Sequence, residues 1–383
     1  MSYTEVFAAK GERKAGWLEL FYDLAVVAAL IVTNDSFVDH PTLGSGVFAV
    51  LSLVALFGLW FLTSLIHNRF PVDGLPYRGL LLIQMACILL AALAINSDAV
   101  ITWQDGLLSM AVALITISCL FAIARKRAGQ PVPGIRVSII SPLLGAVVCL
   151  IGVTLSRDLL ALIIAVVITV ALAPIMFTLR EHDGGVFPIH PDHLRERLGL
   201  LLLIAIGEGF IQLMAQIARS EQEIDYRFFV LVLLFNLSIA VFYFDDVYAE
   251  NKVANPRLWR TTAFAHFLLI IGVAATVDEM AIFAGTPQST WPPDSAGLFS
   301  LAIGALLVGF TLLEWITMGR LAPLDIAQGL LAAGVITYGI IEIVLNLAQT
   351  RGGVLTLAMF FIAWLLLRMS LKLRRTKSTA LIR

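Results

Sequence analysis

Acidic side chains interrupt several long apolar runs of this sequence, and two of them share one helical stripe. Glu19 and Asp23 lie four residues apart in a run that begins at Trp17. A helix therefore places both on one face, about 6 Å apart along its axis. Neighbouring carboxylates in a membrane can share and exchange a proton. The pair predicts a proton or cation site, and the alternative is that each carboxylate caps or salt-bridges a neighbouring helix.

A second charged stripe opens the apolar run that follows residue 190. His193 and Arg197 are four residues apart, with Glu196 between them, and Glu208 follows Arg197 by eleven residues. Eleven residues are close to three helical turns, so Glu208 lies about 16 Å deeper on nearly the same face. Acids at such depth are rare and usually mark a pathway. We expect a functional role for Glu208, with structural pairing as the alternative, whereas His193 also fits a simple hydrogen-bonding role.

A third acidic group, Asp245, follows the aromatic stretch 242–244. We expect it at the same membrane depth as Glu19, Asp23 and residues 193–197. A cation such as Arg197 would offset these acids, so a closed structural network is the alternative to a gate. The substrate or proton pathway is therefore predicted to use Glu19, Asp23, His193, Glu196, Arg197, Glu208 and Asp245, with Asn68, Arg69, His266 and Glu314 as secondary candidates.

The elements that must position these groups are transmembrane helices. The 383 residues are 59% hydrophobic and 14% charged, and their mean hydropathy is +0.91. Apolar runs of about 17 to 25 residues recur, each long enough to span about 30 Å of hydrocarbon. The sequence predicts an all-α, polytopic membrane bundle of about twelve helices. Their expected ranges are 17–35, 46–66, 76–95, 105–124, 137–155, 158–179, 197–218, 228–249, 261–284, 297–317, 324–346 and 353–373.

The distribution of basic residues predicts the orientation of these helices. If both termini are cytoplasmic, 22 of the 26 Lys and Arg residues fall on the cytoplasmic side, including those from Arg368 onward. The expected divisions are a cytoplasmic tail at 1–16, a six-helix half at 17–179, a cytoplasmic linker at 180–196, a second half at 197–373 and a basic tail at 374–383. Similar openings of the first and seventh spans suggest a 6+6 parallel repeat.

Several classes of function are disfavoured by what the sequence lacks. The net charge is −1, and no Gly-rich phosphate loop or basic-aromatic run is found, so nucleic acid is not an expected partner. The three cysteines lie inside apolar segments without metal-ligand spacing. We therefore predict no catalytic residue, no metal and no cofactor.

The charged motifs together resemble the bacterial low temperature requirement protein A (LtrA) family. The resemblance rests on Glu-Leu-Phe-Tyr-Asp-Leu at 19–24, Asn-Arg-Phe at 68–70, His193 with Glu196-Arg197-Leu-Gly-Leu, Gly207-Glu208, Tyr243-Phe244-Asp245 and His266. This chain has Phe21-Tyr22 where the family usually has two phenylalanines, and Gly209 where a serine often follows the Gly-Glu pair. The resemblance implies a bacterial membrane protein of a family named for growth at low temperature, and it supplies no molecular activity.

The leading functional hypothesis is a transporter or permease of the bacterial cytoplasmic (inner) membrane, with proton coupling through the acidic groups. Its expected partners are the lipid bilayer and a small solute or ion that the sequence does not identify, and no oligomeric state is predicted. One alternative is an intramembrane enzyme that acts on lipid through His193 or Glu208. Another is a membrane sensor or accessory protein in which the charged groups serve structure alone.

Overall fold

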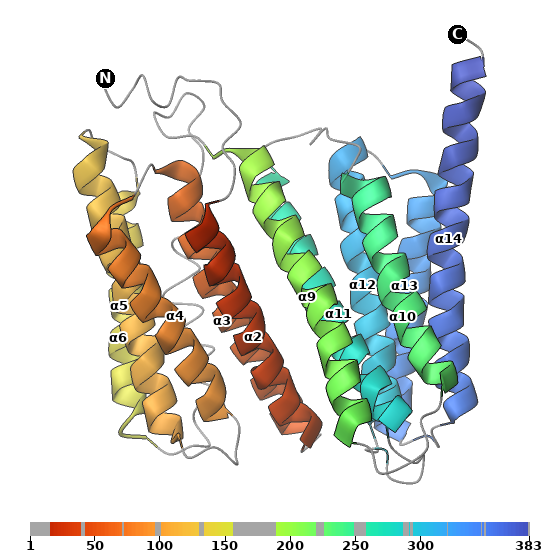
Figure 1. The fold of residues 1–383 in the computed structure, drawn as a ribbon, viewed down its shortest axis with the longest axis horizontal. Coiled ribbons are helices and arrows are strands. Elements are labelled where there is room, and N and C mark those ends of the chain that lie inside the picture. Colours follow the sequence, from red (N-terminus) through yellow and green to blue (C-terminus); the bar gives the residue numbers. More distant parts are fainter. Residues whose placement is uncertain are drawn as a thin grey trace. The chain divides into compact units, whose positions relative to one another are not determined.

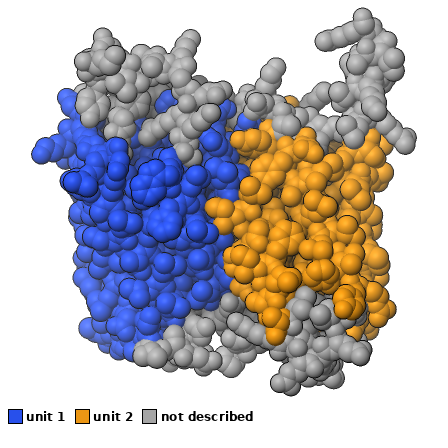
Figure 2. Space-filling view, viewed as in Figure 1, with its two compact units in different colours: residues 1–201 blue, residues 202–383 orange. Residues whose placement is uncertain are grey.

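The structure is a computed structural model that divides the chain into two compact units, residues 1–201 and 202–383 (Figure 2). It describes residues 16–39, 43–70, 73–95, 101–129, 134–155, 189–219, 226–248, 258–285, 291, 294–319, 321–345, 347 and 350–381. Each unit is considered by itself below.

The first unit is a bundle of long helices (Figure 1). Its helices are α2 (Trp17–Asp39), α3 (Leu43–Arg69), α4 (Leu75–Ile95), α5 (Trp103–Ala128), α6 (Ile135–Gly152) and the first part of α9 (Pro191–Arg219). Helix α2 packs on α3 and α4, and α5 packs on α3, α4 and α6. The polar groups of α2 are thereby enclosed by the helices around it.

Local sequence chemistry sets the ends of these helices. Thr102 and Asp105 form a reciprocal capping box at the start of α5, which satisfies backbone N–H groups that the first turn leaves unpaired. The same helix ends at Gly129, whose left-handed conformation (φ 65°) is accessible without strain to glycine. Pro191 opens α9, where its missing N–H costs nothing and its fixed φ suits the first helical residue.

The second unit contains the remaining part of α9 and six further elements. These are α10 (Tyr226–Val241), the π-helix η3 (Phe242–Tyr248), α11 (Trp259–Gly285), α12 (Ser295–Met318), α13 (Pro323–Leu345) and α14 (Arg351–Leu381). Helix α12 packs on α11, α13, α14 and η3, so it is the central helix of this unit. Helix α10 joins α14 through Phe235 and Phe361, whose ring centroids lie 4.9 Å apart.

Close packing of α12 depends on glycines at the helix crossings. A Cβ added to Gly339 of α13 would lie 2.7 Å from the carbonyl oxygen of Gly297, and one added to Gly297 would lie 2.9 Å from the carbonyl oxygen of Gly339. On the α11 side, a Cβ on Gly309 would lie 3.0 Å from the carbonyl oxygen of Ala265. Small residues let helix backbones approach closely. Because the hydrophobic effect does not drive helices together in lipid, such close packing contributes to their association.

The predicted class of fold is confirmed, because the described residues form helices and no strands, and the chain is a polytopic helical membrane protein. Nine of the described helices are long and apolar enough to cross a membrane. In α13 only 22% of the spanning window is buried inside the protein, and Leu330 and Val344 are exposed on it. Such a surface suits contact with lipid.

Described helices coincide with eleven of the twelve predicted spans. The remaining span, 158–179, lies outside the described residues, as does most of the predicted linker at 180–196. The eighth predicted span, 228–249, is two consecutive elements, because α10 passes into the π-helix at Phe242. The proposed 6+6 repeat and the orientation in the membrane stay predictions.

Two alanine substitutions on α13 test the glycine contact. Gly339→Ala places its methyl group against the Gly297 carbonyl, so we expect a loss of stability of about 1–3 kcal/mol. Gly334→Ala on the same helix meets nothing within 4 Å and should be neutral or slightly stabilising, since alanine favours helix over glycine by up to about 1 kcal/mol. Unfolding in detergent measures both, and equal effects would contradict close packing at Gly339.

Candidate functional site

A fully buried guanidinium lies at the centre of the polar core of the first unit. The Arg197 side chain is 0% exposed. Its Nη1 donates to Oε2 of Glu19 at 2.5 Å, and its Nη2 and Nε donate to Oδ1 and Oδ2 of Asp23 at 2.5 and 3.0 Å. Two nitrogens of the planar guanidinium thus bind both oxygens of Asp23, a bidentate geometry that lysine cannot form. Glu19 and Asp23 thus share one cation, as their spacing on one helix face predicted.

Trp60 of α3 completes the coordination of Asp23. Its indole Nε1 donates to Oδ1 of Asp23 at 2.5 Å, and its ring centroid lies 5.8 Å from Cζ of Arg197. Both side chains are fully buried. The indole therefore supplies a hydrogen bond to the anion and a cation–π contact to its partner. Trp60 thus links α3 to both α2 and α9.

The tautomer of His193 follows from the hydrogen bonds of Asn68. The Asn68 Oδ1 accepts the backbone N–H of His190 at 2.8 Å, and its Nδ2 donates to the His190 carbonyl at 2.8 Å, which fixes the orientation of the amide. The same Nδ2 lies 3.3 Å from Nδ1 of His193. Because Nδ2 is a donor, Nδ1 accepts, and the neutral imidazole carries its proton on Nε2.

That Nε2 lies near one member of the acidic pair. It lies 3.5 Å from Oε2 of Glu19, the oxygen that also accepts from Arg197. The Asn68 amide additionally pairs with both backbone groups of His190, the residue just before α9 begins. His193 is therefore linked, through Asn68, to the point where α3 meets the start of α9.

A second polar layer lies beside this site. The Tyr22 hydroxyl donates to Oγ1 of Thr63 at 3.4 Å, and that oxygen lies 3.2 Å from Oε1 of Gln84. All three side chains are buried, and they join α2, α3 and α4. Among the described residues the Nε2 of Gln84 has no hydrogen-bond partner. Buried polar groups are costly unless bonded, so this layer is a polar extension of the site rather than ordinary packing.

Among the described residues, the charged groups bonded to one another in this site are two carboxylates and one guanidinium. Two carboxylates face one guanidinium, and the neutral tautomer of His193 adds no charge. Uncompensated charge in a membrane protein interior costs several kcal/mol. One imidazole, that of His193, lies beside the acidic pair, with its Nε2 3.5 Å from Oε2 of Glu19.

The structure brings together five of the predicted residues, Glu19, Asp23, Asn68, His193 and Arg197. Glu196 is half-buried but lies on another face of α9, since adjacent helical residues point in different directions. Arg69 lies with its Cζ 5.8 Å from the ring centroid of Phe70.

The other predicted residues belong to the second unit. Among the described residues no hydrogen bond or ion pair reaches the half-buried carboxyl of Glu208, for which structural pairing was the alternative expectation. Asp245 is exposed on the π-helix, and its predicted proximity to the Arg197 site stays a prediction. His266 is buried, with Nε2 at 2.7 Å from the Tyr243 hydroxyl and Nδ1 at 2.7 Å from the Thr262 carbonyl. Glu314 bonds to Arg368 at 2.6 Å.

The serine that often occupies position 209 in the family does not fit here without rearrangement. A Cβ at Gly209 would lie 2.8 Å from Cγ2 of Val277, whereas one at Gly207 meets nothing within 4 Å. Valine is stiff about χ1 and cannot swing aside easily. Glycine at 209 is therefore required by the close approach of α9 to α11 in this chain.

Sequence analysis missed two groups of the first unit. Neither Trp60 nor Gln84 was among the predicted site residues. A signal for Gln84 exists, since an amide inside an apolar run needs a partner. The role of Trp60 had no comparable signal, because tryptophan near a span end is ordinarily an interfacial anchor.

Removing the buried cation tests whether the site holds the first unit together. Arg197→Gln leaves two buried carboxylates without their partner, so we expect a loss of about 3–5 kcal/mol in unfolding free energy. The matched control is Arg78→Gln, whose partner is Asp73 and whose side chains are 46% and 71% exposed. There the hydrogen bond from Arg78 lowers the pKa of the Asp73 carboxyl.

The exposed pair contributes at most about 1 kcal/mol, so Arg78→Gln should leave the unfolding transition nearly unchanged. Chemical unfolding of both purified variants in the same detergent makes the comparison. If the unfolding transition of Arg197→Gln is as close to that of wild type as the transition of Arg78→Gln is, the buried site does not stabilise the first unit.

Comparison with known proteins identifies the group to which the chain is related. The family model described as "Bacterial low temperature requirement A protein (LtrA)" matches residues 14–368. A curated protein of Rhizobium meliloti (strain 1021), described as uncharacterized, is 26% identical over 322 residues, which cover 77% of this chain and 74% of that protein. No solved structure matches. With the match covering nearly its whole length, the chain belongs to the bacterial LtrA family.

Proposed function

We propose that the protein is a proton-coupled membrane transporter whose coupling site consists of Glu19, Asp23, His193 and Arg197. One observation carries the proposal: two buried carboxylates share one guanidinium, with an imidazole 3.5 Å from one of them. A buried site with this composition needs a proton to be neutral, and ionisable groups inside membrane proteins commonly form proton relays.

The hydrogen bonds of His193 supply a route from protonation to movement. In the neutral tautomer Nδ1 accepts from Asn68. A protonated imidazole has donors on both nitrogens, so Nδ1 can no longer accept and faces the Nδ2 donor of Asn68. Protonation therefore strengthens the contact with Glu19 and breaks the contact with Asn68. Because Asn68 also holds the backbone of His190, the change reaches the start of α9.

The predicted topology places this site where a coupling group is useful. With cytoplasmic termini, the start of α2, the end of α3 and the start of α9 all lie in the cytoplasmic half of the membrane. A proton arriving from that side meets His193 and Glu19 before the fully buried Asp23. The predicted twelve-helix topology supports the proposal only by analogy with transporters.

Proton flux in proteoliposomes tests the proposal. An imposed pH gradient, with a panel of candidate solutes, should drive flux through the wild-type protein. Asp23→Asn and Glu19→Gln keep the size of each side chain but remove one carboxylate, so the site no longer needs its proton. We expect flux to fall at least about tenfold in both.

Glu342→Gln is the matched control, because Glu342 accepts a hydrogen bond from Ser300 in the second unit and is not one of the residues of the proposed coupling site. It should transport as wild type does. Absence of flux with every solute in folded wild-type protein would contradict transport. A changed lipid composition on incubation with the protein would instead support the intramembrane lipid enzyme.

A further inference from the structure

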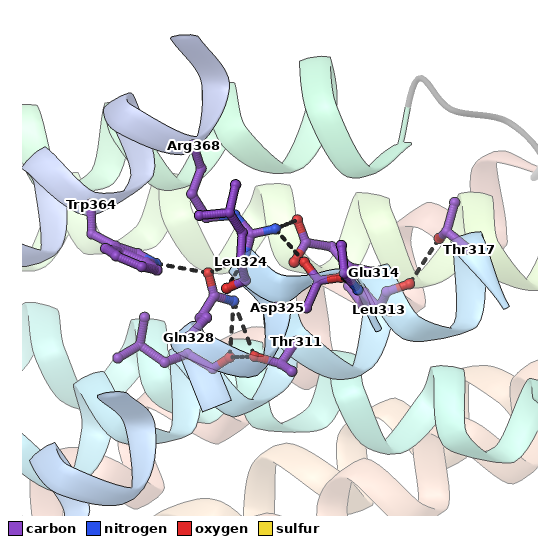
Figure 3. A network of polar contacts seen from close by, with 11 residues as sticks. Thr311, Leu313, Glu314, Thr317, Leu324, Asp325, Gln328, Trp364 and Arg368 are labelled. Atoms are coloured by element: carbon purple, nitrogen blue, oxygen red, sulfur yellow. Dashed lines mark hydrogen bonds and ion pairs between the residues drawn. The ribbon is translucent and has the colours of Figure 1, made fainter. Parts of the chain in front are cut away.

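Two fully buried glutamines, one in each unit, differ in how their amides are hydrogen-bonded. Gln328 of α13 has partners at both ends of its amide (Figure 3). Its Oε1 accepts from Nη1 of Arg368 at 2.8 Å and from Nε1 of Trp364 at 2.9 Å. Its Nε2 lies 3.2 Å from the Leu307 carbonyl and 3.1 Å from Oγ1 of Thr311. An amide bonded in this way is fixed in one orientation, so Gln328 serves structure.

The network around Gln328 also holds Arg368 of α14. Nη2 of Arg368 donates to Oε1 of Glu314 at 2.6 Å and to Oδ1 of Asp325 at 2.5 Å (Figure 3). Glu314 belongs to α12 and Asp325 to α13, so one nitrogen joins three helices. Loss of the Gln328 amide would take an acceptor from both Arg368 and Trp364, and a lost buried hydrogen bond is destabilising.

Gln84 of α4 is just as buried but is poorly bonded. Its Nε2 has no hydrogen-bond partner among the residues that the structure describes. Its Oε1 lies 3.2 Å from Oγ1 of Thr63, but that hydroxyl has a single proton and also donates to the Leu59 carbonyl at 2.9 Å. The oxygen of Gln84 therefore shares one proton with a backbone carbonyl, and its nitrogen has no acceptor.

An amide bonded so poorly costs stability, because it has left water without gaining equivalent hydrogen bonds. An apolar side chain of similar shape would avoid that cost at the same position. Binding sites combine apolar walls with a few polar groups whose hydrogen bonds a ligand completes. The Gln84 amide, together with Thr63 and Tyr22, has the character of such a group.

A second buried polar group lies on the same face of α4. Tyr77 precedes Gln84 by seven residues, close to two helical turns, so both lie on one stripe about 10 Å apart. The Tyr77 ring lies edge-on to that of His67 of α3, with centroids 5.0 Å apart. Within the described parts of the chain, the Tyr77 hydroxyl has no hydrogen-bond partner. Buried polar groups thus extend from the first turn of α4 inward to Gln84.

The charged groups nearest in the chain are already bonded to each other. Asp23 follows Tyr22, but both its oxygens accept from Arg197, and Oδ1 also accepts from Trp60. The Nε, Nη1 and Nη2 of Arg197 all donate to Glu19 or Asp23. Neither Asp23 nor Arg197 therefore offers an uncompensated charge to an ion. The hydroxyl and amide groups beside them carry no formal charge.

We propose that the polar layer formed by Tyr22, Thr63 and Gln84 binds the transported solute, and that this solute is a small neutral molecule with hydrogen-bond donors and acceptors. A polyol or a carboxamide has that chemistry, since hydroxyl and amide groups both donate and accept. The inference rests on the proposed transport function and adds the class of substrate to it. Tyr22 is next to Asp23 in α2, so the solute would bind beside the proposed coupling site.

Unfolding in detergent compares the two glutamines without any measurement of transport. Gln84→Met replaces the poorly bonded amide with an apolar side chain of similar shape, so the midpoint of unfolding should stay the same or rise. Gln328→Met is the matched control and should lower the midpoint, because Arg368 and Trp364 lose their acceptor. A midpoint lowered as much by Gln84→Met as by Gln328→Met would show a structural role for Gln84 and overturn the inference.

Uptake into proteoliposomes under an imposed pH gradient identifies the class of solute. The probes are erythritol and acetamide as neutral solutes, succinate as an anion and choline as a cation. Wild type should take up at least one neutral probe and neither charged probe. Gln84→Met should lower that uptake at least about tenfold, since the amide bonds to the solute are lost. Thr63→Val should do the same, and it decides the test if Gln84→Met fails to fold.

Proton flux measured in the same vesicles separates this inference from the proposed function. Proton flux without uptake of a neutral probe, or with uptake of charged probes alone, would contradict the class of solute and leave proton-coupled transport standing. Neither flux nor uptake in folded wild-type protein would contradict transport itself and the inference with it. Equal uptake of a neutral probe by wild type and Gln84→Met would show that the amide binds an ordered water only, which also overturns the inference.

Discussion

A buried guanidinium bonded to two carboxylates is the interaction on which the polar core of each unit depends. A charge in hydrocarbon is tolerated only when it is paired and hydrogen-bonded, and Arg197 and Arg368 each satisfy that condition through acids on other helices. In the first unit the pair comes from one helix, α2. In the second, one acid comes from α12 and the other from α13. In the first unit the described residues place two carboxylates around one guanidinium, which is the observation that supports the proposed proton-coupling site.

The surrounding packing serves to hold these groups. Trp60 and Asn68 of α3 bind Asp23 and His193, so α3 fixes the position of both sides of the first site. In the second unit, Gln328 fixes Arg368, and glycines at 297, 304 and 309 let α12 lie against its neighbours. A hydrogen-bonded polar network specifies one arrangement of helices more strictly than apolar packing does in lipid.

Much of this could be predicted from the sequence, since the length and spacing of apolar runs are direct consequences of bilayer thickness. The four-residue spacing of Glu19 and Asp23 correctly predicted that they share a face. Partners across helices could not be predicted, because nothing in the order of residues states which helix lies beside which. Arg368 was therefore counted among basic residues at a helix end, although its side chain is buried, and Gln328 was overlooked. Glu208 was favoured for its depth, which by itself supplies no partner.

The proposal that the site around Arg197 carries a proton is tested most directly by counting protons released on unfolding. Purified protein is unfolded at pH 7 in weakly buffered solution, and the release is compared with that of the Glu19→Gln variant. If the proposal is correct, the native protein holds a proton that the unfolded chain, with ordinary carboxyl groups and histidines, gives up at this pH. Wild type should release about one more proton per chain than the variant. Equal release from the two proteins would contradict the account.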